Sequence, residues 1–251
     1  MLKCEQVTYR YNETDGIFNI SLNIEKGECV ALIGLNGSGK STLLHAMAGL
    51  INPQEGSIEW EGEAVRPPKV GIVFQHPDNQ FITTSVLDEM VFGLENIGIP
   101  REEMLERALA ALDQVGMRWA LEKHPMQLSG GEKQRVALAA ILAMEPDVLL
   151  LDEVTSMLDP VAREHFQQII LHLKQKGWTI MYTTHLVEEY LMADRFLMLD
   201  HGELVFDGDL EQLASSTQLP MPFTVELQRT FGLNVKASTW KECIDSLWTS
   251  N

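Results

Sequence analysis

The sequence has little of what marks a membrane-spanning, secreted or metal-binding chain. Its longest apolar runs, such as residues 136–144, are far shorter than the ~18 residues that a membrane-spanning helix needs. The first residues hold no apolar segment of the kind found in secretory signals, so we expect none. The three cysteines, Cys4, Cys29 and Cys243, lack metal-ligand spacing and are interpreted as reduced thiols of a cytosolic protein.

Basic residues are also scarce. There are 19 of them against 36 acidic residues, which gives a formal net charge of −17. Nucleic acid and anionic lipid surfaces would repel such a chain, so we expect no nucleic-acid partner. If the protein works at a membrane, a protein partner has to hold it there.

Short apolar runs alternate with helical patterns along the chain. Such alternation predicts an α/β fold with a parallel sheet that helices cover on both faces. Tight-turn signals also predict two hairpins. The predicted strands are residues 28–33, 70–74, 147–151 and 178–183; the predicted helices include 100–116 and 160–177; the predicted hairpins are 57–65 and 195–207.

A phosphate-binding motif follows the first predicted strand and precedes a helical pattern. It reads Gly34-Leu35-Asn36-Gly37-Ser38-Gly39-Lys40-Ser41 and fits G-x-x-x-x-G-K-S/T. The glycines let backbone N–H groups surround a phosphate, and the helix N-terminus adds partial positive charge. Lys40 reaches the β- and γ-phosphates and the Ser41 hydroxyl suits Mg²⁺. Because the flanking elements fit as well, we predict a bound nucleoside triphosphate.

Two carboxylates stand at the end of a later predicted strand. Asp152 and Glu153 follow the apolar residues 148–151, at the end of the strand where α/β sheets bind their ligands. Asp152 is placed to hold the Mg²⁺ shell. Glu153 is then placed to orient or deprotonate an attacking water.

A second helix N-terminus distinguishes this chain from other nucleotide-binding proteins. Leu128-Ser129-Gly130-Gly131-Glu132 precedes a helical run, and its free N–H groups suit another phosphate contact. One nucleotide does not need two such cradles from one chain. We therefore predict a dimer in which the second cradle of each chain covers the γ-phosphate bound to the other.

Together these motifs resemble the ABC (ATP-binding cassette) ATPases over essentially the whole chain. Residues 34–41 are similar to the Walker A motif, 128–132 to the LSGGQ signature and 148–153 to Walker B. Gln75 matches the Q-loop, residues 156–159 the D-loop and His185 the switch histidine. Two departures are mild, Glu132 for the usual Gln and Val154 for the usual Pro, and neither removes a catalytic group.

The resemblance implies roles for individual residues, with ATP and Mg²⁺ as cofactors. Glu153, His185 and Gln75 would be catalytic, and Ser41, Gln75 and Asp152 would hold the metal. Tyr11 would stack on adenine, although Tyr9 is an adjacent candidate. The remaining nucleotide contacts would come from Gly34, Leu35, Asn36, Gly37, Ser38, Gly39, Lys40, Ser41 and Thr42 and, toward the other chain, from Ser129, Gly130, Gly131, Glu132 and Asp159.

A narrower resemblance is to the energy-coupling factor transporters, and within them to the first of their two paralogous ATPase subunits. It rests on residues 74–81, 91–96 and 155–160. That group implies uptake of vitamins or of cobalt and nickel ions. The implied partners are a second ATPase subunit, identical or paralogous, a transmembrane coupling subunit that docks near residues 75–96, and a substrate-capture membrane protein. The implied location is the cytoplasmic face of the cell membrane. The alternative is the ATPase of another ABC importer or exporter.

The same resemblance predicts the domain organisation. Residues 1–251 would form one ABC-type domain with a mostly parallel sheet, an N-terminal antiparallel β part, an inserted helical subdomain and a small helical appendage. Residues 1–75 and 145–215 would be the nucleotide-binding core and 76–144 the helical subdomain. Residues 216–251 would be a C-terminal dimerisation appendage.

The phosphate motif generates a direct prediction. Because Lys40 supplies the fixed positive charge at the phosphates, Lys40→Ala should abolish tight MgATP binding and hydrolysis. Titration with a fluorescent ATP analogue measures this. A variant that binds ATP as tightly as the wild type would contradict the phosphate-loop interpretation.

Overall fold

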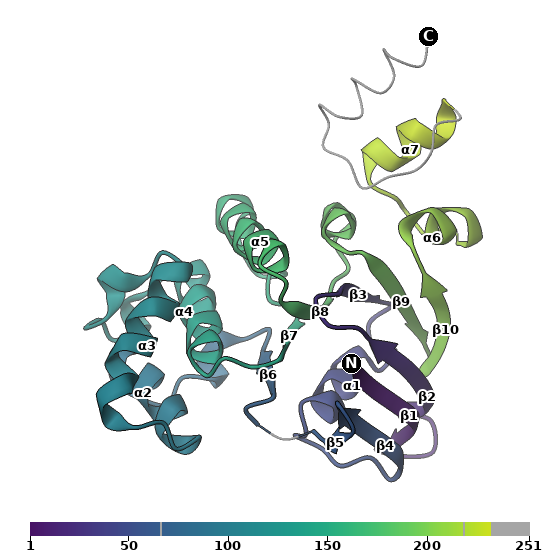
Figure 1. The fold of residues 1–251 in the computed structure, drawn as a ribbon. Helices are drawn as coiled ribbons and strands as arrows, with labels where there is room; N and C mark the ends of the chain where they lie inside the picture. The colour runs from purple at the N-terminus through teal and green to yellow at the C-terminus, as the bar shows by residue number, and fades with distance from the viewer. Residues whose placement is uncertain (66, 218, 232–251) are drawn as a thin grey trace.

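Two β-sheets form the centre of the protein (Figure 1). The computed structural model describes residues 1–65, 67–217 and 219–231. In the larger sheet the order is β10-β9-β3-β8-β7-β6, parallel except where β9 and β10 form a hairpin. Its strands are β3 (Cys29–Ile33), β6 (Val70–Val73), β7 (Val148–Asp152), β8 (Thr179–Thr183), β9 (Arg195–Asp200) and β10 (Glu203–Gly208).

Helices cover both faces of this sheet, as the continuous apolar runs predicted. Successive residues of β7 enter different cores. Leu149 and Leu151 pack in a cluster with α4 (Gly130–Ala143) and α5 (Pro160–Gln175). Val148 and Leu150 pack in a second cluster with α1 (Lys40–Met47). The four predicted strands are confirmed to within one residue at each end.

The smaller sheet is the predicted antiparallel part near the N-terminus. Its order is β2-β1-β4-β5, and α1 lies between it and the larger sheet. Fully buried Trp60 and Ile17 line the core beneath it. Its strands are β1 (Leu2–Arg10), β2 (Gly16–Ile24), β4 (Glu55–Trp60) and β5 (Glu63–Ala64), which include the predicted hairpin 57–65.

A helical lobe stands to one side of the sheets, at the left of Figure 1. It consists of α2 (Val86–Asn96), α3 (Arg101–Gln114) and α4. The spacing of Leu105, Ala108, Leu109 and Leu112 in the sequence predicts one buried stripe on α3, but the Leu105 side chain is 49% exposed. The buried stripe is instead Met104, Ala108, Ala111 and Leu112, because the lobe contacts the adjacent face of the helix.

The remaining elements are two C-terminal helices and several short turns. Two helices end the described region, α6 (Leu210–Ser216) and α7 (Phe223–Thr230). The sequence also has a capping-box pattern at Thr239 and Glu242, which lies outside the described residues. Short 3₁₀ turns occur at η1 (Pro77–Asn79), η2 (Arg118–Ala120), η3 (Pro125–Gln127) and η4 (Val187–Met192).

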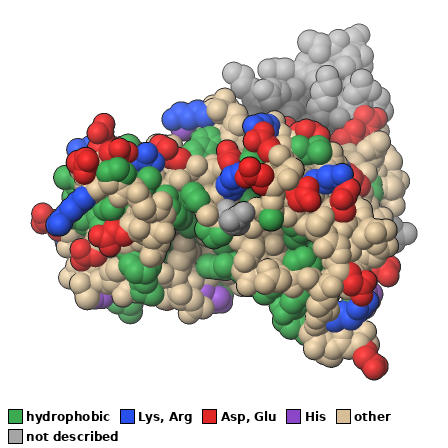
Figure 2. Space-filling model, turned by 60° about the horizontal axis from the view of Figure 1, so that its bottom comes forward, with side chains coloured by type: hydrophobic (Ala, Val, Ile, Leu, Met, Phe, Trp, Pro, Cys, Tyr) green, Lys and Arg blue, Asp and Glu red, His purple; other side chains and the backbone are tan. Residues whose placement is uncertain are grey.

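Acidic and basic side chains are intermixed on the face that Figure 2 shows. Hydrophobic side chains gather there along the boundary between the two lobes. Over the described part of the chain, every helix is too short or too polar to cross a bilayer.

Candidate nucleotide site

The predicted phosphate-binding loop joins β3 to α1. Gly39 caps the helix with a φ of 97°, a left-handed conformation that favours glycine. A β-carbon at Gly39 would lie 2.9 Å from Ile17 Cγ2, so a side chain would push the loop away from β2. Lys40 is only 5% exposed, and its Nζ donates to the carbonyl oxygens of Gly34 and Leu35 at 3.0 Å each.

The loop presents donors that no described residue satisfies. The Ser38 hydroxyl is buried and has no hydrogen-bond partner among the described residues. Within the same residues, the backbone N–H groups of Gly39, Lys40 and Ser41 make no hydrogen bond outside α1. At a helix N-terminus, such donors fit the oxygens of a nucleotide phosphate.

Two acidic residues meet at the carboxyl end of β7. Glu153 has a φ of 46°, which turns the backbone out of the sheet. Its N–H donates to the Thr183 hydroxyl on the neighbouring strand at 2.8 Å. That hydroxyl donates in turn to Oδ1 of Asp152 at 2.8 Å. One buried threonine therefore fixes the backbone of one acid and the carboxylate of the other.

Three other segments converge on the Glu153 carboxylate. Lys40 Nζ lies 3.8 Å from one carboxylate oxygen, and His185 Nδ1 lies 3.7 Å from the other. Gln75 Nε2 donates to that second oxygen at 3.3 Å and to the Ser156 hydroxyl at 3.1 Å. The three residues predicted to be catalytic, Glu153, His185 and Gln75, therefore lie together beside the phosphate loop.

The predicted metal ligands suit a hard cation. The Ser41 hydroxyl, the Asp152 carboxylate and the Gln75 amide oxygen all offer oxygen, which Mg²⁺ prefers. Among the described residues, no group of three or more His, Cys, Asp or Glu could hold an ion alone. A cation here would depend on the nucleotide phosphates for further ligands, as Mg²⁺ commonly does.

The predicted signature forms the N-terminus of α4. Ser129 is its N-cap, and Glu132 Oε2 accepts from both the N–H (2.7 Å) and the hydroxyl (2.9 Å) of Ser129. These hydrogen bonds hold the pKa of Glu132 below its usual value. Glutamate, like the glutamine it replaces, thus completes a capping box. A β-carbon on Gly131 would lie 2.6 Å from Ala162 Cβ, so glycine lets α4 approach α5.

The signature and the phosphate loop do not meet within one chain. Ser129 and Gly130 are exposed. Among the described residues, no hydrogen bond or ion pair joins residues 129–132 to residues 34–42 or to Glu153. Within the described part of the chain, the second phosphate cradle therefore makes no bond to the first and is open to solvent.

Comparison with known proteins decides the family. The sequence pattern of the ABC transporter family matches residues 17–156, which include the phosphate loop, Gln75, the signature and both strand-end acids. The chain belongs to the ABC transporter family. It is an ATP-hydrolysing subunit of that class, as its motifs predicted.

Full-length relatives narrow the assignment of this cassette. It is 40% identical to the energy-coupling factor transporter ATP-binding protein EcfA1 of Bacillus subtilis, over 99% of this chain and 96% of the relative. It is similar to cbiO1 of Clostridium perfringens, part of the ABC transporter complex cbiONQ (TM-score 0.77, 31% identity, 92% and 95% coverage). It is also similar to the cassette MJ0796, solved as a dimer bound to ADP and Pi (TM-score 0.71, 30% identity, 84% and 99% coverage). The predicted membership of the energy-coupling factor group is confirmed.

Two further predicted contacts of the cassette have clear positions. Tyr11 is 61% exposed, and its ring meets that of Tyr9 edge to face at 5.1 Å. Tyr11 is therefore the more accessible of the two candidates for adenine. Asp159 is the N-cap of α5, where it accepts from the N–H groups of Val161 and Ala162.

The sequence marked Ser156 only as part of the D-loop and did not mark Thr183 at all. Thr183 and Ser156 hydrogen-bond to the catalytic segments from a neighbouring strand and from the following turn. Thr183 is two residues before His185, but no motif marks it. Its role follows from strand pairing, which places it opposite Asp152.

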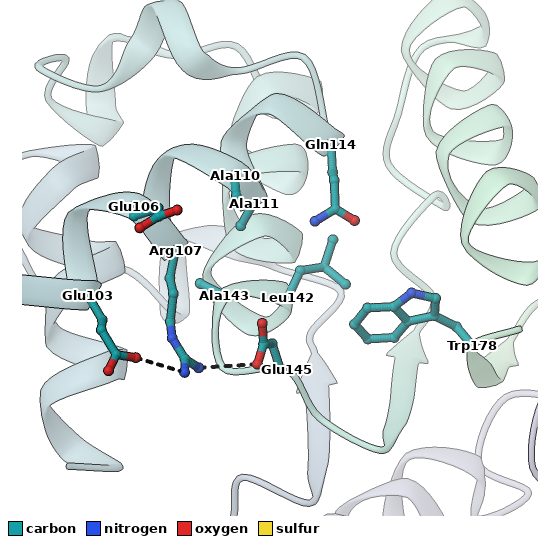
Figure 3. Close-up of a pocket in the computed structure, with 10 residues that line it drawn as sticks. All are labelled: Glu103, Glu106, Arg107, Ala110, Ala111, Gln114, Leu142, Ala143, Glu145 and Trp178. Atoms are coloured by element: carbon teal, nitrogen blue, oxygen red, sulfur yellow. Dashed lines mark hydrogen bonds and ion pairs between the residues drawn. The ribbon is translucent and has the colours of Figure 1, made fainter. Parts of the chain in front are cut away.

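One hollow of the described surface lies away from the nucleotide site. It has a volume of about 460 Å³ and lies between α3, the end of α4 and Trp178 (Figure 3). Arg107 there pairs with Glu103 and Glu145. Glu145 and Trp178 precede β7 and β8, so this hollow lies at the amino ends of these strands. Glu153 lies at the carboxyl end of β7.

The cluster around Glu153 generates a prediction about the chemical step. Glu153→Gln should lower turnover by at least about 10², the usual lower bound for a general base, because an amide cannot accept the proton of water. ATP affinity should be kept or increased, since one negative charge beside the triphosphate is removed. Phosphate release and ATP binding, measured on one preparation, separate the two effects.

A matched control is Glu188→Gln, which removes an exposed carboxylate three residues after His185 and should leave turnover unchanged. Turnover at the wild-type rate in Glu153→Gln would leave the group that acts on water unidentified.

Proposed function

We propose that two cassettes close around ATP and that hydrolysis by the pair drives an energy-coupling factor importer for a vitamin or a transition-metal ion. The observation that carries this proposal is the separation of the two phosphate cradles. The loop that begins α1 and the signature that begins α4 each present an exposed or unpaired helix N-terminus, yet no described bond joins them. A second cassette, identical or paralogous, would bring the missing cradle.

In the closed pair, each residue of the Glu153 cluster has its own task. Lys40 would exchange its two carbonyl partners for phosphate oxygens. Glu153 would take a proton from water, and His185 would hold the γ-phosphate and the water in place. Ser41, Asp152 and Gln75 would hold a Mg²⁺ ion, which neutralises charge on the phosphates. Hydrolysis would then release the pair.

The segment after Gln75 is proposed as the dock for a transmembrane coupling subunit. Within residues 75–96, Ile82 is 65% exposed and Phe92 is 41% exposed, so the dock has an apolar surface. Lys133 Nζ of the signature helix pairs with Asp78 in this segment at 2.5 Å, and Gln134 Nε2 donates to the carbonyl of Phe74, directly before the segment, at 2.9 Å. Movement of the dock would therefore move the signature.

Membrane attachment follows from these partners in the proposal. The cassette would lie at the cytoplasmic face of the membrane, held by the coupling subunit, and a separate membrane protein would capture the substrate. Residues 216–251 would contribute to ATPase dimerisation. These assignments are supported by the family and by the docking segment.

Mixing two inactive variants tests whether the site is shared between chains. Lys40→Ala disables one cradle and Ser129→Arg the other, so each homodimer has two broken sites. In a mixed dimer both substitutions fall in one composite site and the other site is intact. We expect the mixture to recover up to about a quarter of wild-type turnover, because about half of randomly mixed dimers carry one intact site.

The matched control places Lys40→Ala and Ser129→Arg in the same chain and mixes it with wild type. Mixed dimers then have two broken sites, so this mixture should lose turnover beyond simple dilution. The homodimer does not share its sites between chains if two results are found together. The mixed single variants stay inactive, and the double variant lowers the turnover of wild type only by dilution. The partner of this chain could also be a paralogous ATPase subunit. The mixing experiment is therefore repeated with the ATPase subunit that co-purifies with this chain.

The docking segment can be tested separately. Ile82→Asp should weaken co-purification of the transmembrane subunit, because a central apolar contact contributes about 2 kcal/mol or more to an interface. ATP hydrolysis by the isolated cassette should persist. Leu105→Asp, on the same helical lobe and 49% exposed, is the control that should keep the complex. Equal recovery of the complex with both variants would place the dock elsewhere.

A further inference from the structure

A buried carboxylate that the proposed mechanism does not use lies behind the nucleotide site. Glu189, on η4, is 1% exposed, the lowest value among the described acidic residues. Its Oε1 accepts from the Thr155 hydroxyl at 2.6 Å and from Gln167 Nε2 at 3.1 Å. A carboxylate away from water is stable only where donors reach it, so these bonds define its position.

The single oxygen of Glu189 joins three segments of the site. Thr155 lies in the turn directly after Glu153 and Val154, and Gln167 lies on α5, whose N-cap is Asp159. Glu189 itself is four residues after His185. The bonds therefore connect the turn that follows the proposed base, the helix that follows the D-loop and the loop that bears the switch histidine.

Surrounding contacts keep Glu189 rigid. The Tyr182 hydroxyl donates to the Glu189 backbone carbonyl at 2.7 Å, and the Glu189 N–H donates to the Leu186 carbonyl at 3.1 Å. Burial raises the pKa of Tyr182 well above its usual range, so the phenol stays a donor. The hollow left between Thr155, Glu189 and their neighbours measures only about 10 Å³, which leaves little room for the segments to shift.

We propose that Glu189 is a positioning residue of the ATPase site, which through Thr155 fixes the turn after Glu153 relative to the loop that bears His185. The inference rests on the roles proposed above for Glu153 and His185. In that proposal the side chains of Glu153 and His185 contact the same phosphate and water, but they lie on different loops. Rigid attachment of the two loops behind the site supplies the required alignment.

Thr155→Val removes the hydroxyl and keeps the shape of the side chain. We expect a fall in kcat of roughly tenfold or more, because misplacement of a reacting group by about 1 Å can cost about 10²-fold. The KM for ATP and the affinity for ATP should stay unchanged, since the phosphate loop is untouched. Thr155→Ser keeps the hydroxyl and should restore most of the turnover.

Thr179→Val is the matched control for loss of a buried threonine hydroxyl. Thr179 is 4% exposed, and its hydroxyl accepts from the Gly27 N–H at 3.0 Å, at the opposite end of β8 from Thr183. Both valine variants should lose thermal stability to a similar extent. Only Thr155→Val should lose kcat, so a general loss of stability would not mimic the expected result.

A double-substitution cycle tests the contact itself. Glu189→Ala should also lower kcat, and adding Thr155→Val to it should lower kcat by no more than about twofold further, because the two residues act through one hydrogen bond. Wild-type kcat in Thr155→Val, a Thr155→Ser variant as slow as Thr155→Val, or fully additive losses would each overturn the inference. Glu153→Gln is measured in parallel to distinguish failure of this inference from failure of the proposed function. If Glu153→Gln is inactive and Thr155→Val is fully active, the proposed function stands and only this inference fails.

Discussion

The carboxylate of Glu153 is the point at which separate segments of the chain have to meet. Gln75 donates to it, and Lys40 and His185 lie 3.8 and 3.7 Å from its oxygens. These partners follow β6, β3 and β8, while Glu153 itself follows β7. The strand order β3-β8-β7-β6 makes all four carboxyl ends neighbours along one edge. The hydrophobic burial that fixes this order therefore also assembles the site.

The electrostatic potential needed at the phosphate site is opposite in sign to the net charge of the protein. A chain of net charge −17 binds a triphosphate only if positive potential is local. Lys40 and the α1 N-terminus supply it, and burial in contact with two carbonyls keeps the ammonium in place. The N-terminus of α4 offers similar donors, but it is exposed, and among the described residues it makes no hydrogen bond to this chain's own phosphate loop. The arrangement favours a second cassette as the source of the missing cradle.

Much of the fold and of the site was predictable because their signals are local. Apolar runs gave the buried strands, and side chains at fixed spacing gave the phosphate loop, both acids and the signature. Long-range pairing has no such signal: Thr183 matters because β8 lies beside β7, and Glu189 matters because a turn, a helix and a loop pack together. Leu105 was misjudged as part of an apolar stripe because two overlapping stripes fit α3, and only the packed structure selects one.

A dilution series in MgATP tests most directly whether this chain holds only half of each site. At each concentration, the turnover per chain and the molecular mass are measured. The series is run with a reducing agent: burial raises the pKa of Cys4 and Cys29 to about 12 and disfavours their thiolates, but Cys243 lies outside the described residues. We expect turnover to fall as the cassettes separate into monomers, and we expect a second cassette, either this chain or a co-purified subunit, to restore it. A monomer that hydrolyses ATP at the full rate would show that one chain holds a complete site.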